Sequence, residues 1–535
     1  MSPADTSVKE RAVLRQQKDM LLRLASCSGT TLFLLVCGSR ILVLLAMLVS
    51  YAVLPRLLNA ELVLDTSGLL HNDTVGQWAF LDFPRNWDGV HFSHIANYGY
   101  SHENNCAFFP FVPCLFQILS WLNKLFLLAP FAVIPVSFQV AVLNAVLNGV
   151  SAIFLRRITV LTLLRPETTG RGRFGGTWLD ELPPPPPPRH GSRKEKDRDG
   201  DVKLRLRREL GAVLLMWIMS PTLVFTVVAY TESFFCCLTF AGLHLLLVSS
   251  EECRKFVAAS AEAGAVFCFF LAGWARSNAF LYVGFMLYPT MLQIFFFDMY
   301  RRRYIQCHGS YKLCRRWPSA GRCLVLFIEI FIICAPFLCM NYFCFNRFAP
   351  LWDSTTRVAI GNRFWSFYGL VQKRYWNVEF LGSYTMKNLP NVFIAAPVVF
   401  FTLRGIMLFY VLPAFTKAST ALFNEGARRG SEGRRNDKGG NKILFSCVSL
   451  LGRLVKVSVQ SSNMAYLVVS IFFGVSMMHI NVVNRFIMSS PALYWIWARQ
   501  LVWDPWGGCT IVMLRFFVVW TCIGILFFPN SMPWT

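Results

Sequence analysis

The sequence predicts an all-α polytopic membrane protein, and three observations support that fold class. Of the 535 residues, 55% are hydrophobic and 15% are charged, whereas about 25% are charged in an ordinary soluble domain. Apolar stretches of about 20 residues, the length that crosses a bilayer, recur along the chain. The basic residues concentrate between those stretches. This composition excludes a disordered chain, a coiled coil and a collagen, and it argues against a soluble enzyme.

Eight apolar stretches are expected to cross the membrane, within one transmembrane domain that covers residues 30–535. They are residues 30–54, 135–155, 211–248, 264–297, 323–345, 391–413, 457–478 and 509–528. The stretches 211–248 and 264–297 are longer than a simple span, and Ser220-Pro221 is expected to kink or split the first.

Residues 107–128 are also apolar enough to cross, but a crossing there would place residues 156–208 on the wrong side. Either this stretch is a re-entrant or interfacial element broken by Pro110 and Pro113, or a further crossing lies nearby. The expected number of transmembrane helices is therefore about eight to eleven.

The distribution of charge predicts the orientation. Lys and Arg exceed Asp and Glu by 23, and 22 of those charges fall in four segments. Basic flanks stay on the cytosolic side of a membrane, so these segments are assigned to the cytosol and no nucleic-acid partner is expected. They are the N-terminus (1–29), the insertions 156–208 and 417–456, and residues 301–322. The segments 55–106, 249–263, 346–390 and 479–508 are left on the other side.

The loops 55–106 and 346–390 are long and mix aromatic with charged residues, which suggests folded structure that carries function. Asn72 lies in the only Asn-x-Ser/Thr sequon, so it is a glycosylation candidate that supports a luminal loop. Asp88, between Trp87 and Gly89, suits a general base near the membrane surface. Alternatively, Asp88 caps the helix that follows it.

Ionisable residues at membrane depth are costly to insert and indicate function. Glu232, Arg276, His479 and Arg485 lie within or beside predicted spans, with Asn484 next to the last of them. A structural Glu232–Arg276 pair that joins two helices is the alternative for those two residues. His479 and Arg485 are too far apart to share one helical face closely, but they can line one cavity.

Tyr375, Trp376 and Asn377 lie in the second long loop, where the aromatic rings form either a platform for sugar or an interfacial belt. No Cys or His cluster has zinc-site spacing. No metal site and no cofactor are predicted, and metal dependence is left open. A disulfide between Cys106 and Cys114 is left open.

Several ordered motifs together resemble one family, the PIG-V or GPI mannosyltransferase 2 family. Motifs of the first half are Trp87-Asp88-Gly89-Val90, Ala107-Phe108-Phe109-Pro110, Ser220-Pro221, Ala229-Tyr230-x-Glu232-Ser233 and Arg276-Ser277-Asn278. Motifs of the second half are Tyr375-Trp376-Asn377-Val378, Leu389-Pro390-Asn391, Arg485-Phe486 and Ser489-Ser490-Pro491. Thr231 and Ala279 depart from the pattern, and the insertions 166–208, 301–322 and 424–441 fall outside it.

The resemblance implies a GT-C glycosyltransferase in the endoplasmic reticulum membrane with a large first luminal loop and a luminal active site. Such an enzyme adds the second mannose, in α-1,6 linkage, from dolichyl-phosphate mannose to the GPI precursor glycolipid. Membrane lipids and a small membrane subunit are its implied partners.

The implied reaction is an inverting displacement in which Asp88 accepts the proton of the acceptor hydroxyl. The candidates for binding the donor phosphate are Arg276, Arg485, His479, Asn484 and Arg85. The candidates for contacts with the acceptor or sugar are Trp87, Glu232, Asn278, Tyr375, Trp376 and Asn377.

Three other functions are weighed against this one. Another polyprenyl-phosphate-sugar transferase of the same fold is the nearest. A secondary transporter would also use buried charges and broken helices, but it should show internal repeats and short loops, which this chain does not. A structural subunit of the same membrane would tolerate Asp88→Ala.

Overall fold

The computed structural model describes residues 16–58, 79–125, 134–164, 195–251, 254–297, 301, 316–352, 361, 363–412 and 461–532. Within these ranges every regular element is helical. Eight helices are long and apolar enough to cross a membrane. The prediction of an all-α polytopic membrane protein is therefore confirmed.

Five of the predicted spans are found close to their expected bounds. They are α2 (Gly29–Leu58), α6 (Val136–Thr159), α12 (Ala320–Phe348), α15 (Leu389–Ile406) and α21 (Gly508–Phe527). α18 (Ser462–Ser476) occupies a sixth. These helices are apolar around most of their circumference, as expected for segments that face lipid or a buried core.

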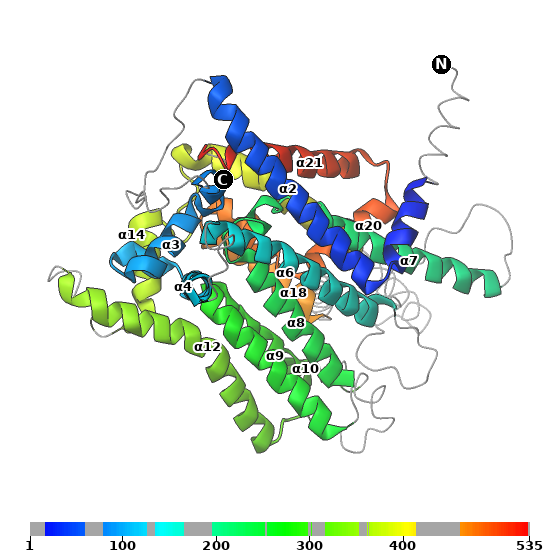
Figure 1. Ribbon diagram of the computed structural model, residues 1–535. Helices are drawn as coiled ribbons and strands as arrows, with labels where there is room; N and C mark the ends of the chain where they lie inside the picture. The colour runs from blue at the N-terminus through cyan, green and yellow to red at the C-terminus, as the bar shows by residue number, and fades with distance from the viewer. Residues whose placement is uncertain are drawn as a thin grey trace, which may run out of the picture.

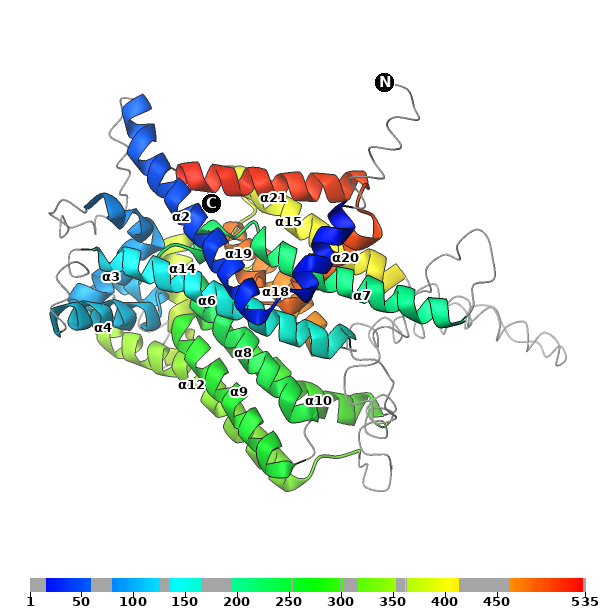
Figure 2. The same cartoon turned by 45° about the vertical axis from the view of Figure 1, so that its right-hand side comes forward.

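Two predicted spans are broken, and the breaks build the interior. α7 (Glu195–Ile218) ends before Ser220-Pro221, a short η5 (Val224–Thr226) follows, and α8 (Glu232–Glu251) begins a new helix. In the same way, α9 (Lys255–Ala275) is separated by η6 (Ser277–Tyr282) from α10 (Val283–Phe295). The start of α8 and the end of α9 meet, because the two helices lie antiparallel and side by side (Figures 1 and 2).

The separation of α9 from α10 changes the side of the membrane on which residues 249–263 are expected. Arg322, in the basic segment that was assigned to the cytosol, has its Nη2 atom 2.8 Å from Glu262 Oε1 in α9. Residues 249–263 therefore lie at the same end of the bundle as residues 316–322, and their assignment to the other side is wrong. The long apolar stretch 264–297 concealed a reversal of chain direction.

Residues 479–508, which the sequence left between two predicted spans, are largely helical and buried. They form η11 (Ile480–Val482), α19 (Val483–Ile487) and α20 (Pro491–Trp503). α20 is buried on almost every side, and Trp495 Nε1 donates a hydrogen bond to Thr159 Oγ1 at 2.9 Å. Arg499 and Gln500 lower the hydropathy of α20, so this buried helix was not recognisable from the sequence as part of the bundle.

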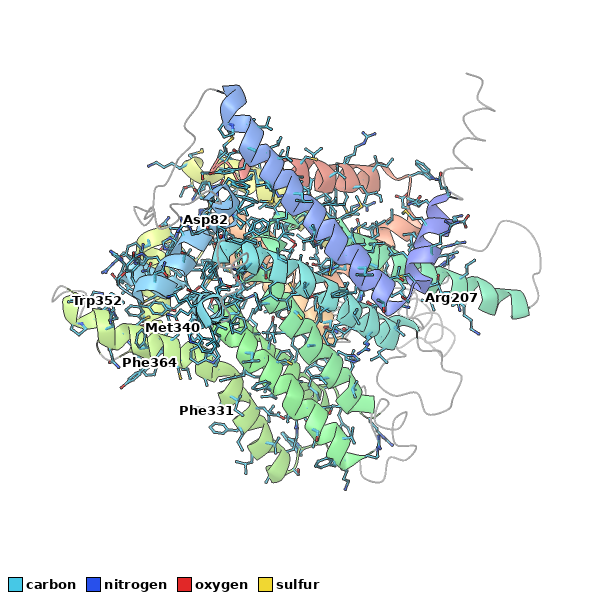
Figure 3. The ribbon with its side chains drawn as sticks, in the orientation of Figure 1. Asp82, Arg207, Phe331, Met340, Trp352 and Phe364 are labelled. Atoms are coloured by element: carbon cyan, nitrogen blue, oxygen red, sulfur yellow. The ribbon has the colours of Figure 1, made fainter. Side chains whose placement is uncertain are left out.

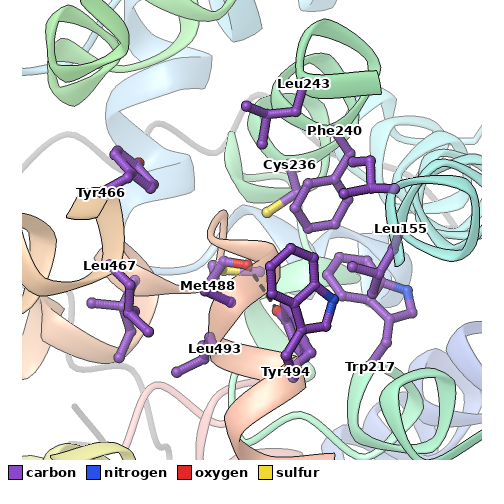
Figure 4. Close-up of a cluster of buried hydrophobic side chains, with 14 of the residues drawn as sticks. Leu155, Trp217, Cys236, Phe240, Leu243, Tyr466, Leu467, Met488, Leu493 and Tyr494 are labelled. Carbon is purple, nitrogen blue, oxygen red and sulfur yellow. Dashed lines mark hydrogen bonds between the residues drawn. The ribbon is translucent and has the colours of Figure 1, made fainter. Parts of the chain in front are cut away.

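The main hydrophobic core surrounds α20 (Figure 4). Tyr494 packs edge-on against Trp217 of α7, with ring centroids 5.3 Å apart, and its hydroxyl donates to the Met488 carbonyl at 2.8 Å. Cys236 and Phe240 of α8 and Leu467 of α18 complete this cluster. α20 thus joins the two halves of the chain.

A layer of short helices covers one end of the bundle (Figures 1 and 2). It contains η1 (Ala79–Arg85), α3 (Asp88–Tyr98), η2 (Glu103–Ala107), α4 (Phe111–Leu125) and α14 (Phe367–Trp376). The smaller turns η7 (Ala349–Leu351), η8 (Phe364–Ser366) and η9 (Met386–Asn388) follow α12 and precede α15. We call this the Asp88 end. Asp82 lies there, whereas Arg207 of α7 lies at the opposite end (Figure 3).

α4 corresponds to the ambiguous stretch 107–128. It is not among the helices long enough to cross, and its buried face, Val112, Pro113 and Phe116, packs near α3 and α6. This favours the interfacial alternative over a hidden crossing. Cys106 and Cys114 are both free thiols, the first buried and the second exposed.

Candidate active site

Asp88 is presented by a tight turn. Gly89 N donates to the Asn86 carbonyl at 3.3 Å, and Trp87 has φ 60° and ψ −120°. These angles match the second position of a type II′ turn, which favours glycine. A non-glycine residue there costs on the order of 1–3 kcal/mol, and such strain is concentrated at functional sites.

The structure does not place Asp88 at the N-cap of α3, and its role as a general base stays a prediction. Trp87 is the N-cap residue of α3, and Asp88 is the first residue of the helix. Asp88 Oδ2 lies 2.8 Å from Arg485 Nη2, so its carboxylate faces an arginine of α19. The side chain of Asp88 is 34% exposed, which leaves it accessible from solvent or to a substrate.

Four charged side chains form one continuous chain of ion pairs. Arg485 joins Asp88 to Glu232, and Glu232 Oε1 also accepts from Arg276 Nη1. Arg485 Nε and Arg276 Nη1 are both 2.5 Å from that oxygen. The two negative and two positive charges sum to zero, which lowers the free-energy cost of burying them together.

Glu232 is completely covered by its partners. Its side chain has 0% exposure, whereas those of Arg276 and Arg485 are each 13% exposed. Of the two roles expected for Glu232, the structure shows the pairing with arginine and places no part of the carboxylate at the surface. The predicted Glu232–Arg276 pair is present, and Arg485 extends it to Asp88.

A cavity of about 390 Å³ lies against this chain. Its lining includes Asp88, Arg276 and Arg485 together with His479, Asn278 and the aromatic residues Trp87 and Trp376. The segments that supply them lie far apart in the sequence, and Arg276 and Asn278 come from the break between α9 and α10. His479 and Arg485 line one cavity, as the sequence allowed.

Tyr230 is a site residue that sequence reasoning did not single out, although it lies in one of the motifs. Its hydroxyl accepts from Asp88 N at 3.0 Å and donates to the Asn86 carbonyl at 3.2 Å. The Arg485 guanidinium lies over the Tyr230 and Phe225 rings, 4.9 and 4.7 Å from their centroids. These cation–π contacts hold the guanidinium in place from the apolar side.

Two uncharged polar groups face the cavity. Asn278 is buried, and its Nδ2 atom has no hydrogen-bond partner among the described residues. A buried donor without a partner suggests a bound ligand. Burial lowers the pKa of His479, so its imidazole is neutral at pH 7 and offers a hydrogen bond rather than a charge.

α14 forms the outer wall and is fastened by Glu103. Glu103 accepts from Arg374 Nη1 at 2.9 Å, from the Tyr375 hydroxyl at 3.1 Å and from Trp352 Nε1 at 3.0 Å. Ser277 Oγ also donates to the Tyr368 hydroxyl at 2.9 Å, which ties α14 to η6. Glu103 was not predicted from the sequence, because nothing local distinguishes it from a solvated loop residue.

The remaining predicted residues lie elsewhere. Arg85 pairs with Asp82 at 2.8 Å and lines a second cavity on another side of α3. Asn484 is buried but does not line the cavity beside Asp88. Tyr375 is directed to Glu103, and Asn377 ends α14 in a left-handed conformation with φ 52°. Asn72 lies outside the described residues.

No three His, Cys, Asp or Glu side chains gather in a group that could hold a metal ion within the described ranges. The residues that line the cavity are instead arginine, carboxylate, amide and aromatic groups, a set that suits an anionic, hydroxyl-rich ligand.

The fold and the cavity together define a polytopic membrane enzyme whose polar site lies at one end of its helical bundle. Comparison with known families makes this specific. A model of the mannosyltransferase (PIG-V) family matches residues 28–172 and 204–535. The chain belongs to that family and is a mannosyltransferase. The match omits residues 173–203 of the predicted insertion, but it runs through 301–322 and 424–441.

Curated relatives agree with this assignment. The chain is 24% identical over 514 residues to GPI alpha-1,6-mannosyltransferase 2 of Homo sapiens, covering 84% of this chain and 87% of the relative. The protein of that name from Cricetulus griseus is 24% identical with the same coverage. GPI mannosyltransferase 2 of Yarrowia lipolytica is 31% identical over 186 residues, or 35% of this chain and 42% of the relative. No solved structure matches the chain.

Proposed function

We propose that this chain transfers the second mannose, in α-1,6 linkage, from dolichyl-phosphate mannose to the GPI-anchor precursor. The observation that carries the proposal is the ion-pair chain Asp88–Arg485–Glu232–Arg276 against an aromatic-walled cavity. This chain of ion pairs supplies the carboxylate of Asp88 and the guanidinium groups of Arg276 and Arg485 to one cavity. The names of the curated relatives support the choice of reaction and acceptor.

Asp88 is the general base of this reaction. A β-linked donor and an α-linked product require inversion, so the acceptor hydroxyl attacks the anomeric carbon on the face opposite the phosphate. The new C–O bond forms as the C–O bond to phosphate breaks, and the hydroxyl proton passes to Asp88. The leaving group, dolichyl phosphate, departs as a stable anion. No second carboxylic acid is therefore needed to protonate it, in contrast to a glycoside hydrolase.

Arg485 and Arg276 receive the departing phosphate. Glu232 fixes both guanidinium groups from behind, so they meet the developing charge without rearranging, which is the effective form of electrostatic catalysis. A donor phosphate competes with Asp88 for Arg485. Donor binding therefore weakens the Asp88–Arg485 pair and makes the carboxylate a better base.

The sugar and acceptor meet the walls of the cavity. Trp87 and Trp376 offer faces for stacking, and Asn278 Nδ2 offers a donor that has no partner among the described residues. His479 is a neutral hydrogen-bonding group for a hydroxyl or phosphate oxygen. Tyr375 and Asn377 act indirectly, by shaping the end of α14 that carries Trp376.

The site operates on the luminal side of the endoplasmic reticulum membrane in this proposal. The basic segments then stay in the cytosol, as the distribution of Lys and Arg favours. Lipid-linked donor and glycolipid acceptor reach the Asp88 end from the bilayer. A small membrane subunit, implied by the family resemblance, remains a prediction.

Complementation tests the substrate and the base together. Cells blocked at the second mannose receive wild type, Asp88→Asn, Asp88→Ala or Asp19→Asn, the last an exposed aspartate before α2. A general base contributes roughly 10²–10⁴-fold, so both Asp88 variants should accumulate the one-mannose intermediate while Asp19→Asn restores transfer. Normal transfer by Asp88→Ala, at equal protein abundance, would refute the role of Asp88.

A further inference from the structure

The turn that carries Asp88 is held from outside its own segment. Asn86 Nδ2 donates to the carbonyl oxygens of Phe528 and Pro529, at 3.2 and 2.9 Å. Both acceptors follow α21, more than 440 residues later in the chain. Asn86 is thus the link between the strained turn and the end of the last helix.

The segment 528–532 is itself firmly placed. Asn530 is buried, and its Nδ2 atom donates to Ser50 Oγ of α2 at 3.1 Å and to the Leu526 carbonyl at 2.6 Å. Met532 N donates to the Phe527 carbonyl at 3.1 Å. The carbonyls that Asn86 uses therefore have fixed positions relative to α2 and α21.

Phe528 connects this segment to the other side of the turn. It is 1% exposed, lines the cavity and packs edge-on against Tyr230 at 5.7 Å between ring centroids. Tyr230 in turn binds the backbone on both sides of Trp87, through Asp88 N and the Asn86 carbonyl. Side-chain and backbone groups of the turn are thus clamped together.

We infer that Asn86 and residues 528–530 form a positioning clamp that sets the direction of the Asp88 carboxylate by holding Trp87 at positive φ. This inference rests on the proposed role of Asp88. Without the clamp, Trp87 relaxes to negative φ, and the peptide between Trp87 and Asp88 rotates. The carboxylate then leaves the geometry needed for proton transfer, and small displacements of a reacting group lower the rate strongly.

The first arm of the test removes the clamp. Asn86→Ala, and the isosteric Asn86→Asp that lacks the amide donor, are assayed with purified protein, dolichyl-phosphate mannose and the one-mannose acceptor. Misplacement of about 1 Å costs roughly 10²-fold, so kcat should fall between 10- and 100-fold while KM for the donor changes little. The matched control is Asn97→Ala, an exposed asparagine on α3, the helix that follows the turn, which should keep wild-type kcat.

The second arm separates positioning from a merely structural role. Glycine adopts positive φ without strain, whereas alanine does not. Both Trp87→Gly and Trp87→Ala remove the indole ring, so only relief of strain distinguishes them. Asn86→Ala/Trp87→Gly should therefore recover kcat by at least about fivefold over Asn86→Ala/Trp87→Ala. Equal kcat in the two double variants would overturn the clamp.

The result also separates the clamp from the proposed function. Asp88→Asn is assayed beside these variants, and elution in size-exclusion chromatography checks that each is folded. Loss of transfer in Asp88→Asn with wild-type kcat in both Asn86 variants would overturn the clamp alone. Retained transfer in Asp88→Asn would overturn the role of Asp88 and the clamp with it. If Asn86→Ala does not fold, the test uses Asn86→Asp in its place, alone and combined with Trp87→Gly or Trp87→Ala.

Discussion

Glu232 organises the site through a single oxygen atom. Its Oε1 accepts from both Arg276 and Arg485, and its side chain has 0% exposure. Charges buried to this extent are tolerated only when every one of them is paired. The carboxylate therefore serves as the fixed counter-ion that holds the guanidinium groups of Arg276 and Arg485 beside the cavity.

Replacing Glu232 with Gln should damage stability and activity together. Two buried arginines would lose their shared counter-ion, and breaking a buried pair costs about 3–5 kcal/mol. We expect a lower melting temperature in detergent and loss of mannosyl transfer. The control is Glu262→Gln, which breaks a more exposed pair with Arg322 at the opposite end. Wild-type melting and transfer in Glu232→Gln would contradict this account.

At the residue scale, the free-energy cost of placing a charged side chain in the membrane was a useful signal in the sequence. Glu232, Arg276 and Arg485 were singled out because a charge is expensive at membrane depth, whereas Asp88 was singled out by its position between Trp87 and Gly89 near the membrane surface. Arg85 was a candidate for the donor phosphate, but Asp82 lies one turn before it in η1 and pairs with it. Tyr230 and Asn86 could not be found this way, since uncharged side chains become informative only when their partners are known.

At the scale of elements, α14 depends on the short η2 for its position. Glu103 binds Arg374, Tyr375 and Trp352 together, and the ring of Trp376 lines the cavity beside them. This contact joins the first long loop to the second. One carboxylate thus sets the distance between two walls of the site.

Glu103→Ala should raise KM more than it lowers kcat. Each hydrogen bond to a charged group contributes about 1.5–3 kcal/mol, so loss of this contact should raise KM roughly tenfold as Trp376 shifts. Steady-state kinetics with varied acceptor check this. Glu379→Gln, which breaks an exposed pair with Lys373 on the same helix α14, is the control and should behave as wild type. Unchanged KM in Glu103→Ala would count against the role of this contact.

The packing of α7 gives a second element-scale prediction. A Cβ atom at Gly211 would overlap the backbone carbonyl of Leu21, so the two segments touch without a side chain between them. Overpacking costs about 1–3 kcal/mol. Gly211→Ala should lower the melting temperature, whereas Gly38→Ala, with nothing within 4 Å, should not. Equal melting temperatures for the two variants would show that α7 and the backbone at Leu21 can move apart without loss of stability.

Hydropathy predicted the positions of the long helices better than it predicted where the chain reverses direction between them. α2, α12 and α21 were predictable because each is a long and mainly apolar stretch without a break in the helix. The α9–α10 reversal was not, since η6 is short and lies inside a stretch, residues 264–297, that is apolar enough as a whole to resemble one long span. α20 was missed because a helix buried in protein can carry Arg499, whereas a lipid-facing span of that length cannot.

The whole molecule separates its polar groups between two ends. Asp88, Glu232, Arg276 and Arg485 gather at the Asp88 end, whereas the Glu262–Arg322 and Glu209–Arg499 pairs lie at the opposite end. The end opposite Asp88 is the one from which the chain continues into basic segments such as 156–208 and 301–322. A single membrane orientation therefore satisfies both the charge rule and the position of the cavity.

Glycosylation mapping tests that orientation. We expect Asn72 to be glycosylated and its shift on gels to disappear in Asn72→Gln. A new sequon inserted between α8 and α9 should remain unmodified, because the structure places that connection away from Asp88. A glycan at the inserted site, with Asn72 unmodified, would reverse the orientation.

The contact of residues 528–530 with Asn86 also fixes an order of biosynthesis. Every side chain of the ion-pair chain is translated earlier than Phe528, and the turn before Asp88 precedes it by most of the sequence. During translation, a nascent chain can insert its first helices and fold its first loop, yet it lacks the partner for Asn86. From the proposed roles of Asp88 and Asn86, we expect mannosyl transfer to begin only after residues 528–530 have been made, so products truncated before Phe528 would lie in the membrane without transfer activity.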